Sequence, residues 1–207
     1  MGTFVKRFLE YEKKLKSKYK HLGLTITVSG LSSSGKTTGA KVIAKHFGLK
    51  YHSSGTIFRE VAKNMAISLE KFSEIRSDEI DLKIDEETLK LAIIGNVVLD
   101  GRLTGWVAGE WAEVRIFYNT PLKIRARRYA EREGIDYKTA LTNVKKRDEA
   151  DMKKYKKLYG INLKDLSIYN IIIDNSNWSL EDANKKPIKI IEEFLKRRKN
   201  ENNTNSF

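Results

Sequence analysis

The sequence predicts an α/β fold in which helices flank both faces of a parallel β-sheet. One observation is the glycine-rich segment Gly30 to Thr38, which matches the phosphate-binding pattern G-x-x-x-x-G-K-[ST]. It follows the apolar, β-branched run 24–28 and precedes 36–47, where apolar residues recur at helical spacing. The other observation is that strand-like and helix-like segments alternate along the rest of the chain. Such alternation favours a parallel sheet, whose ligands bind at the carboxyl ends of the strands.

Each element has its own signal in the sequence. Short apolar runs rich in β-branched residues predict strands, and apolar residues spaced three or four positions apart predict helices. The predicted strands lie at 24–29, 50–52, 96–99, 114–118 and 168–173. The predicted helices lie at 36–47, from about 54 onward, and at 68–76, 81–94, 122–133, 137–157 and 179–198.

Two basic segments border the predicted domain, which spans 23–196. Residues 3–21 repeat apolar side chains along one stripe, so the segment 1–22 predicts an extra N-terminal amphipathic helix. The favoured interpretation is that this helix packs on the domain or on a second subunit, and a helix lying on membrane or RNA is the alternative. The tail 197–207 is rich in Lys, Arg and Asn and is predicted to be disordered.

The composition limits the functions open to the chain. Its 207 residues suffice for one sizeable core, and the absence of cysteine excludes disulfides, thiolate metal sites and thiol catalysis. No apolar run approaches the roughly 20 residues that span a bilayer, and no signal-peptide pattern is present, so a cytoplasmic location is expected. The net charge of +13 is concentrated in 1–22, 121–160 and 196–207. Local basic clusters of this kind suit a domain that binds polyanionic nucleotides.

The glycine-rich segment predicts a binding site for the triphosphate of ATP. A strand, a glycine turn and a helix N-terminus direct successive backbone N–H groups toward one point, where phosphate can bind. The side chain of Lys36 would reach the β- and γ-phosphates, and the hydroxyl of Thr37 would ligate Mg²⁺. The residues predicted to bind ATP are Gly30, Leu31, Ser32, Ser33, Ser34, Gly35, Lys36, Thr37 and Thr38.

Two further segments extend this predicted site. Asp100 ends the apolar strand, where it would help to hold Mg²⁺, and Arg102 two residues later could bind a phosphate bidentately. The turn at Ser54 and Gly55 opens a helix that carries Arg59, which offers a second anion site. Because a P-loop binds one triphosphate, a second phosphate-binding element indicates a phosphorylated acceptor.

The segment 121–160 supplies arginines for phosphoryl transfer. Arg125, Arg128 and Arg132 share one helical face, and Arg147 follows on the next predicted helix. A solvated basic face is the commoner role of such a charge run. Transfer of a γ-phosphoryl group, however, depends on cations over the transferring oxygens, and a helical hairpin that closes over the site would supply them and exclude water.

Together these motifs resemble the nucleoside monophosphate kinases and, among them, the archaeal-type cytidylate kinases. The resemblance extends over about 24–195, and its later motifs are more specific to the family than the P-loop. Its motifs are SGLSSSGKTT at 29–38, SGTIFRE at 54–60, SLEKFS at 68–73, LDGRLTGW at 99–106, PLKIRARR at 121–128, YKKLYGI at 155–161 and DLSIY at 165–169.

This resemblance implies a P-loop kinase that uses ATP and Mg²⁺ to phosphorylate CMP, and often dCMP. Its segment for binding the nucleoside monophosphate (NMP) would lie at about 54–94 and its lid at about 125–160. Lys36 would hold the ATP phosphates, and Thr37 and Asp100 would organise the metal. The acceptor would be bound by Ser54, Gly55, Arg59, Arg102, Asp151 and Lys154, and the lid arginines would be Arg125, Arg128 and Arg147. No protein base is required, because the acceptor phosphate is itself the nucleophile.

The chain departs from the family's pattern at two of these positions. An acidic residue is usual where Thr56 stands and an arginine where Lys154 stands, and the N-terminal helix is extra to the family. Asp78, Asp81 and Asp85 form either an acidic patch for the exocyclic amine of cytosine or a solvated helix face, and the solvated face is favoured. Alternative functions are phosphorylation of AMP, UMP or shikimate, and an RNA-binding or ribosome-assembly ATPase that uses the basic termini.

Overall fold

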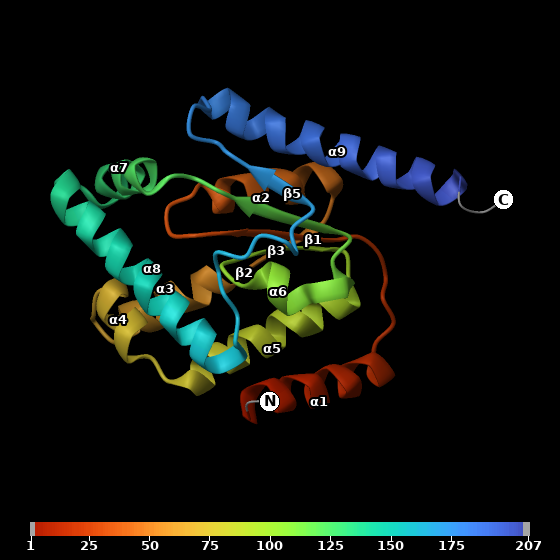
Figure 1. Cartoon of the computed structure of the whole chain (residues 1–207), viewed down its shortest axis with the longest axis horizontal. Helices are drawn as coiled ribbons and strands as arrows, with labels where there is room; N and C mark the ends of the chain where they lie inside the picture. Colours follow the sequence, from red (N-terminus) through yellow and green to blue (C-terminus); the bar gives the residue numbers. More distant parts are fainter. Residues whose placement is uncertain (1–2, 205–207) are drawn as a thin grey trace.

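Five parallel strands form the centre of the protein, as the sequence predicts. The computed structural model describes residues 3–204, and its strands lie in the order β2-β3-β1-β4-β5 (Figure 1). They are β1 (Thr25–Gly30), β2 (Lys50–Ser53), β3 (Val97–Gly101), β4 (Val114–Tyr118) and β5 (Ile171–Ile173). In the register of β1 and β3, Ser29 lies beside Gly101. The P-loop and the segment after β3 therefore leave the sheet at the same edge.

Helices cover both faces of the sheet (Figure 1). One face carries α2 (Lys36–Phe47) and α9 (Leu180–Thr204). The opposite face carries α5 (Asp78–Ile94) and α6 (Thr104–Ala108), with a 3-10 turn at Gly109–Trp111. Four helices lie beyond the carboxyl ends of the strands, namely α3 (Ser54–Asn64), α4 (Leu69–Ile75), α7 (Leu122–Glu133) and α8 (Tyr137–Tyr159). This arrangement leaves room for a ligand between the sheet edge and those four helices.

Separate apolar cores anchor the two helical layers. Ile26 and Val28 of β1 are fully buried with Ile43 of α2 and Ile191 of α9 on one side of the sheet. On the other side, Leu99 of β3 packs in a cluster with residues of α5 and α6. Each such buried side chain contributes about 1.5–3 kcal/mol to folding. The strand ends that carry the predicted site are thus fixed by packing on both faces.

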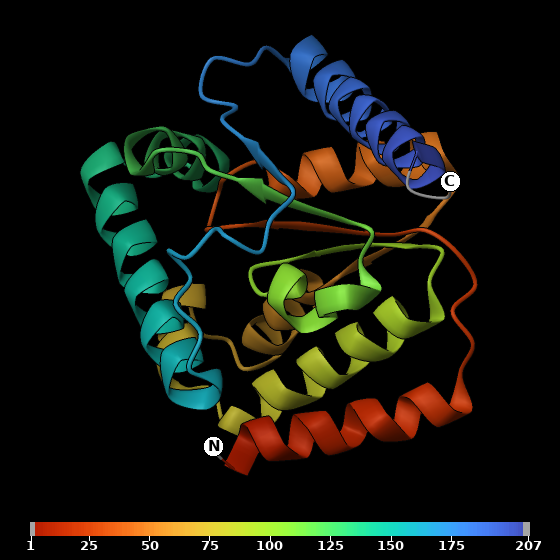
Figure 2. The same cartoon turned by 45° about the vertical axis from the view of Figure 1, so that its right-hand side comes forward.

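The N-terminal helix α1 (Thr3–Lys18) packs on the domain, as the favoured interpretation expects. Figure 2 shows α1 running alongside α5. Leu15 is buried in a cluster with Leu89 and Ile93 of α5, and the indole of Trp111 donates a hydrogen bond to Glu12 (3.0 Å). An apolar stripe along α1 is therefore covered by the layer that also lines the cavity described below.

Two predictions about the C-terminal part need correction. Strand β5 begins at Ile171 rather than 168, because the chain turns first, with the N–H of Tyr169 donating to Leu166 O (3.1 Å). The predicted disorder is wrong for 197–204, where α9 continues, while 205–207 lie outside the described residues. Extending an existing helix costs little, and Arg198 donates to Glu113 O (2.7 Å), which ties the extension to the sheet.

Within residues 3–204, none of the helices has the length and apolar character that crossing a membrane requires. The cytoplasmic location stays a prediction.

Candidate active site

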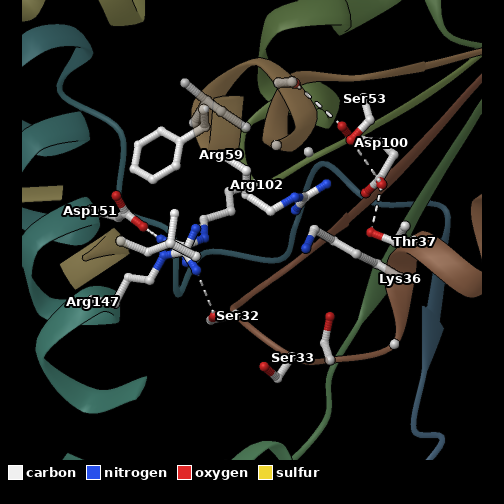
Figure 3. A pocket seen from close by; sticks show the side chains of 18 of the residues that line it. Ser32, Ser33, Lys36, Thr37, Ser53, Arg59, Asp100, Arg102, Arg147 and Asp151 are labelled. Carbon is white, nitrogen blue, oxygen red and sulfur yellow. Dashed lines mark hydrogen bonds and ion pairs between the residues drawn. The ribbon is translucent and has the colours of Figure 1, made fainter. Parts of the chain in front are cut away.

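A cavity of about 500 Å³ opens at the carboxyl ends of β1 and β3. This volume lies within the usual range for small-molecule sites. Residues of the P-loop line one side, and residues of α3, α5 and the turn after β3 line the other, with α7 and α8 closing the cavity (Figure 3). Residues 32–38 all line it, whereas Gly30 and Leu31 of the predicted ATP-binding set do not.

The P-loop is held in shape from behind by side chains of other segments. The carbonyl of Ser34 accepts hydrogen bonds from Asn175 Nδ2 (2.9 Å) and from Arg128 Nη1 (3.1 Å). Gly35 has a φ of 87°, and a Cβ there would lie 2.8 Å from Asn175 Nδ2, so the turn requires glycine. With its carbonyl fixed outward, the loop presents the free N–H groups at the start of α2 to the cavity.

Lys36 extends into this cavity from the first residue of α2 (Figure 3). Burial lowers the pKa of its ammonium to about 8, and the nearby carboxylate of Asp100 opposes that shift. Repulsion by Arg102, Arg147 and Arg59 also contributes to this lowered pKa. Around Lys36 the three guanidinium groups outnumber the one carboxylate that acts on its ammonium, and such a local excess of positive charge attracts a polyanion.

Asp100 is the acidic centre of the site. Its Oδ2 accepts hydrogen bonds from the hydroxyls of Thr37 (2.7 Å), Tyr51 (2.9 Å) and Ser53 (3.2 Å). Its Oδ1 is buried and has no hydrogen-bond partner among the described residues. A buried carboxylate oxygen beside a hydroxyl matches the oxygen ligands that Mg²⁺ takes, so the residues fit the predicted metal.

The opposite side of the cavity carries two of the predicted acceptor arginines. Arg102 is nearly buried and forms an ion pair with Asp151, and its Nη2 is buried without a hydrogen-bond partner among the described residues. Arg59 is exposed and donates to Thr56 Oγ1 (3.2 Å). A Cβ on Gly101 would lie 2.5 Å from Ser54 Oγ, so glycine is needed where β3 meets α3. Ser54 and Gly55 also line the cavity.

The predicted lid arginines occupy different positions. Arg128 and Arg147 line the cavity, and Arg147 Nη1 donates to Ser32 Oγ (3.4 Å). Arg125 does not line it. Its Nη1 instead forms a buried ion pair with Asp148 Oδ2 (2.6 Å) and donates to Ser32 O (3.1 Å). In this arrangement Arg125 fastens α7 and α8 to the P-loop.

The acidic residues of α5 are not a solvated face, and that favoured interpretation is wrong for two of them. Asp81 is 4% exposed and Asp85 is 7% exposed, and both line the cavity. The start of α5 faces the interior because side chains that follow α4 and belong to α8 reach it: Arg76 donates to Asp81 (2.8 Å), and Lys154 Nζ lies 3.1 Å from Asp81 Oδ2. Lys154 is thereby committed to carboxylates and does not line the cavity.

Sequence analysis missed several residues that shape this site. Asn175 follows β5, and the signal that could have found it is the one that found Asp100: a polar residue after an apolar strand. Asp148 and Arg76 are buried ion-pair partners with no such signal. Their role depends on packing between helices far apart in the sequence.

The fold and the site together define a P-loop protein of the α/β class. Its backbone resembles a crystal structure of shikimate kinase from Bacteroides thetaiotaomicron, with a TM-score of 0.56 over 84% of this chain and 98% of that one. At 14% identity this likeness concerns the fold alone.

Sequence comparison identifies the family. The model of the cytidylate kinase-like family matches residues 25–177, and the chain belongs to that family. A cytidylate kinase of Pyrococcus horikoshii is 45% identical over 76% of this chain and 83% of its own length. A cytidylate kinase of Staphylothermus marinus is 40% identical over 84% of this chain and 99% of its own length. Helices α1 and α9 lie outside the matched range.

Proposed function

We propose that this protein transfers the γ-phosphoryl group of MgATP to CMP, and also to dCMP, to give ADP and the corresponding diphosphate. The observation that carries the proposal is one cavity with a phosphate-binding loop on one side and the buried, incompletely bonded guanidinium of Arg102 on the other. The named cytidylate kinases among the relatives support CMP as the acceptor.

On the donor side, the P-loop N–H groups and Lys36 bind the β- and γ-phosphates. Thr37 and Asp100 would hold Mg²⁺, which neutralises charge that develops on the phosphate oxygens. Asp100 also fixes the position of Thr37 through their 2.7 Å hydrogen bond. The donor is thus oriented before the acceptor reacts.

On the acceptor side, Arg59 and Arg102 hold the acceptor phosphate in line with the γ-phosphorus. An oxygen of the acceptor phosphate forms the new P–O bond while the bond from the γ-phosphorus to the β–γ bridging oxygen breaks, and ADP leaves. Arg128 and Arg147 stabilise the charge on the transferring oxygens. No side chain takes a proton, because the attacking oxygen is already ionised.

Helices α7 and α8 form the lid, and α3 to α5 form the part that binds the acceptor. Ion pairs join the two parts: Arg76 Nη2 lies 2.9 Å from Asp151 Oδ1, and Lys157 Nζ lies 3.0 Å from Asp78 Oδ2. Closure through such contacts excludes water, which would otherwise accept the phosphoryl group.

The test is a coupled assay of ADP formation with MgATP and CMP, dCMP, UMP, AMP, GMP or shikimate. We expect the highest kcat/KM for CMP or dCMP. If no acceptor raises turnover above the rate of ATP hydrolysis, the proposed transfer is wrong, and the alternative of an RNA-binding ATPase is tested by RNA binding at varied salt.

A further inference from the structure

One carboxyl group at the acceptor end of the cavity has an open hydrogen-bonding position. Asp85 of α5 is 7% exposed and lines the cavity. Its Oδ2 accepts a hydrogen bond from the hydroxyl of Tyr159 (2.8 Å). Among the described residues no hydrogen bond reaches its Oδ1. A ligand atom that forms a hydrogen bond with this oxygen inside the cavity would therefore gain affinity and specificity.

The neighbouring carboxylate is not open in this way. Both oxygens of Asp81 accept from Arg76 Nε, at 2.8 and 3.0 Å, and Lys154 Nζ lies 3.1 Å from Oδ2. Asp81 is therefore neutralised by two cations. Within residues 3–204, Asp85 has the phenol of Tyr159 as its only hydrogen-bonding neighbour, so two acidic residues one helical turn apart differ in their partners.

The protonation of Asp85 departs from that of an ordinary carboxyl group. The pKa of Asp85 is raised to about 8, mainly by burial and in part by the charge of Asp81, while the hydrogen bond from Tyr159 and the charge of Arg76 oppose the rise. Tyr155 of α8 also faces this group, and burial raises its own pKa to about 12, so it stays neutral. At neutral pH the Asp85 carboxyl is protonated and offers one donor and one acceptor.

The cavity that Asp85 lines also has apolar walls. Phe58, Leu69 and Ile84 are among its lining residues, and apolar side chains suit the faces of a flat ring. A nucleotide whose phosphate is held by Arg59 and Arg102 would have its base within the same cavity, which Asp85 also lines.

We propose that Asp85 recognises the base of the acceptor through hydrogen bonds. This inference rests on the proposed transfer to a nucleoside monophosphate. One oxygen accepts a hydrogen bond from the exocyclic amine of cytosine, and the O–H of the other donates to the adjacent ring nitrogen. Tyr159 is the positioning residue: because its hydroxyl donates to Oδ2, that oxygen is the acceptor and the proton resides on Oδ1.

This arrangement discriminates between pyrimidines. Cytosine presents an amine beside an unprotonated ring nitrogen, which matches the acceptor and donor of Asp85. Uracil presents a carbonyl beside an N–H, so the same approach pairs acceptor with acceptor and donor with donor. Sites built to hydrogen-bond a substrate group reject analogues that lack it, because buried polar atoms are then left unpaired.

The test measures kcat and KM for CMP and UMP at pH 7 in the full-length protein and in Asp85→Ala, Asp85→Asn, Tyr159→Phe and Glu87→Gln. The amide of Asn imitates the protonated carboxyl, with one donor and one acceptor. Glu87 lies on the same helix but pairs with Lys90 at the surface, so it controls for the change of carboxyl to amide.

We expect Asp85→Ala to lower the ratio of kcat/KM for CMP over UMP by about 10-fold or more, with the KM for ATP within about 2-fold. Asp85→Asn should keep CMP within about 3-fold, and Tyr159→Phe should lower the CMP/UMP ratio by reducing control over the carboxyl's proton. Circular dichroism establishes that each variant is folded, and the Asn variant tests the assignment even if the Ala variant is not.

Three results would overturn the assignment of Asp85. One is an unchanged CMP/UMP ratio in Asp85→Ala. Another is an Asp85→Asn variant as impaired with CMP as Asp85→Ala, and a third is an equal effect in Glu87→Gln. In all three the unmodified protein still phosphorylates CMP, so the proposed function stands. An unmodified protein that phosphorylates no nucleotide overturns both.

Discussion

The two sides of the cavity are built by different means. The proposed donor side is one continuous segment between β1 and α2, whose backbone N–H groups and Lys36 would contact the phosphates while Thr37 would bind the metal. The acceptor side is assembled from α3, α5, the turn after β3, and α8, joined by ion pairs such as Arg76 with Asp151. A site formed by one segment can be recognised as a sequence motif. A site formed by four segments is recognised only once their packing is known.

The two sides of the cavity should also differ in how they respond to substitutions. Backbone contacts on the donor side depend on the turn geometry around Gly35, which Asn175 and Arg128 hold from outside. Side-chain contacts on the acceptor side determine which acceptor fits. Substitutions on the donor side should therefore change the rate for every acceptor, and substitutions on the acceptor side should change the choice among acceptors.

The largest effect is expected on the donor side, from Lys36→Ala. Loss of the ammonium should lower kcat by about 10²–10³-fold for every acceptor, because a charge aimed at the transferring group is removed. Lys45→Ala, an exposed lysine on the same helix, is the control and should leave kcat unchanged. Steady-state assays with CMP and UMP check this. A loss restricted to one acceptor would contradict the division between the two sides.

Arg102→Lys tests the acceptor side and should have the next largest effect. It keeps the positive charge and loses the fork that binds phosphate bidentately, so the KM for CMP should rise about 10-fold or more. The KM for ATP should change little. Initial rates with each substrate varied separately give both KM values. An equal rise in the KM for CMP and the KM for ATP would contradict the assignment of Arg102 to the acceptor side.

A pH dependence of stability should follow from Asp85, independently of any substrate. Its pKa is raised from 3.8 to about 8 in the folded protein, so the folded state holds a proton that the unfolded state has lost between these values. Asp81, Arg76 and Tyr159 face this group. Stability supplied by the protonated carboxyl is thus present below about pH 4 and is lost as the pH rises through 8.

The substitution Asp85→Asn should remove this loss of stability at high pH. We expect its thermal midpoint to exceed that of the unmodified protein by about 2 °C or more at pH 8.5, an amount that corresponds to about 1 kcal/mol for a chain of this size. The advantage should shrink as the pH falls toward 5. Calorimetry across this range provides the measurement, and a constant offset at every pH would rule out titration of Asp85 as the cause.

The smallest effect is expected from α1, which lies behind the acceptor side. The ring of Phe8 packs edge-on against Tyr159, with ring centroids 6.2 Å apart. Phe8→Ala should raise the KM for CMP about 3-fold by loosening Tyr159, and should leave the KM for ATP unchanged. Leu9→Ala is the matched control, because Leu9 is 41% exposed on the same helix. Equal effects of the two variants would show that α1 only stabilises the fold.

Sequence analysis predicted the fold well, and it predicted that the P-loop lies at the carboxyl ends of the strands, where residues 32–38 line the cavity. The roles of the individual site residues stay predictions. The order of strands and helices was readable because apolar periodicity is a local property, and the P-loop was readable because one segment contains it. Asp85 was misjudged as solvated, since a carboxylate on a helix usually faces water and its burial here involves a contact with Tyr159, which is 74 positions away in the sequence. The pairing of Arg125 with Asp148 was likewise invisible, because it joins two helices through tertiary packing.

The most direct test of the proposed transfer uses ATP labelled with ³²P at the γ-phosphate and CMP as the acceptor, and it measures which product carries the label. The account predicts that the label appears in CDP, in step with ADP, and that little inorganic phosphate forms while CMP is present. Label released as inorganic phosphate at a rate independent of CMP would contradict a cavity that joins a donor site to an acceptor site.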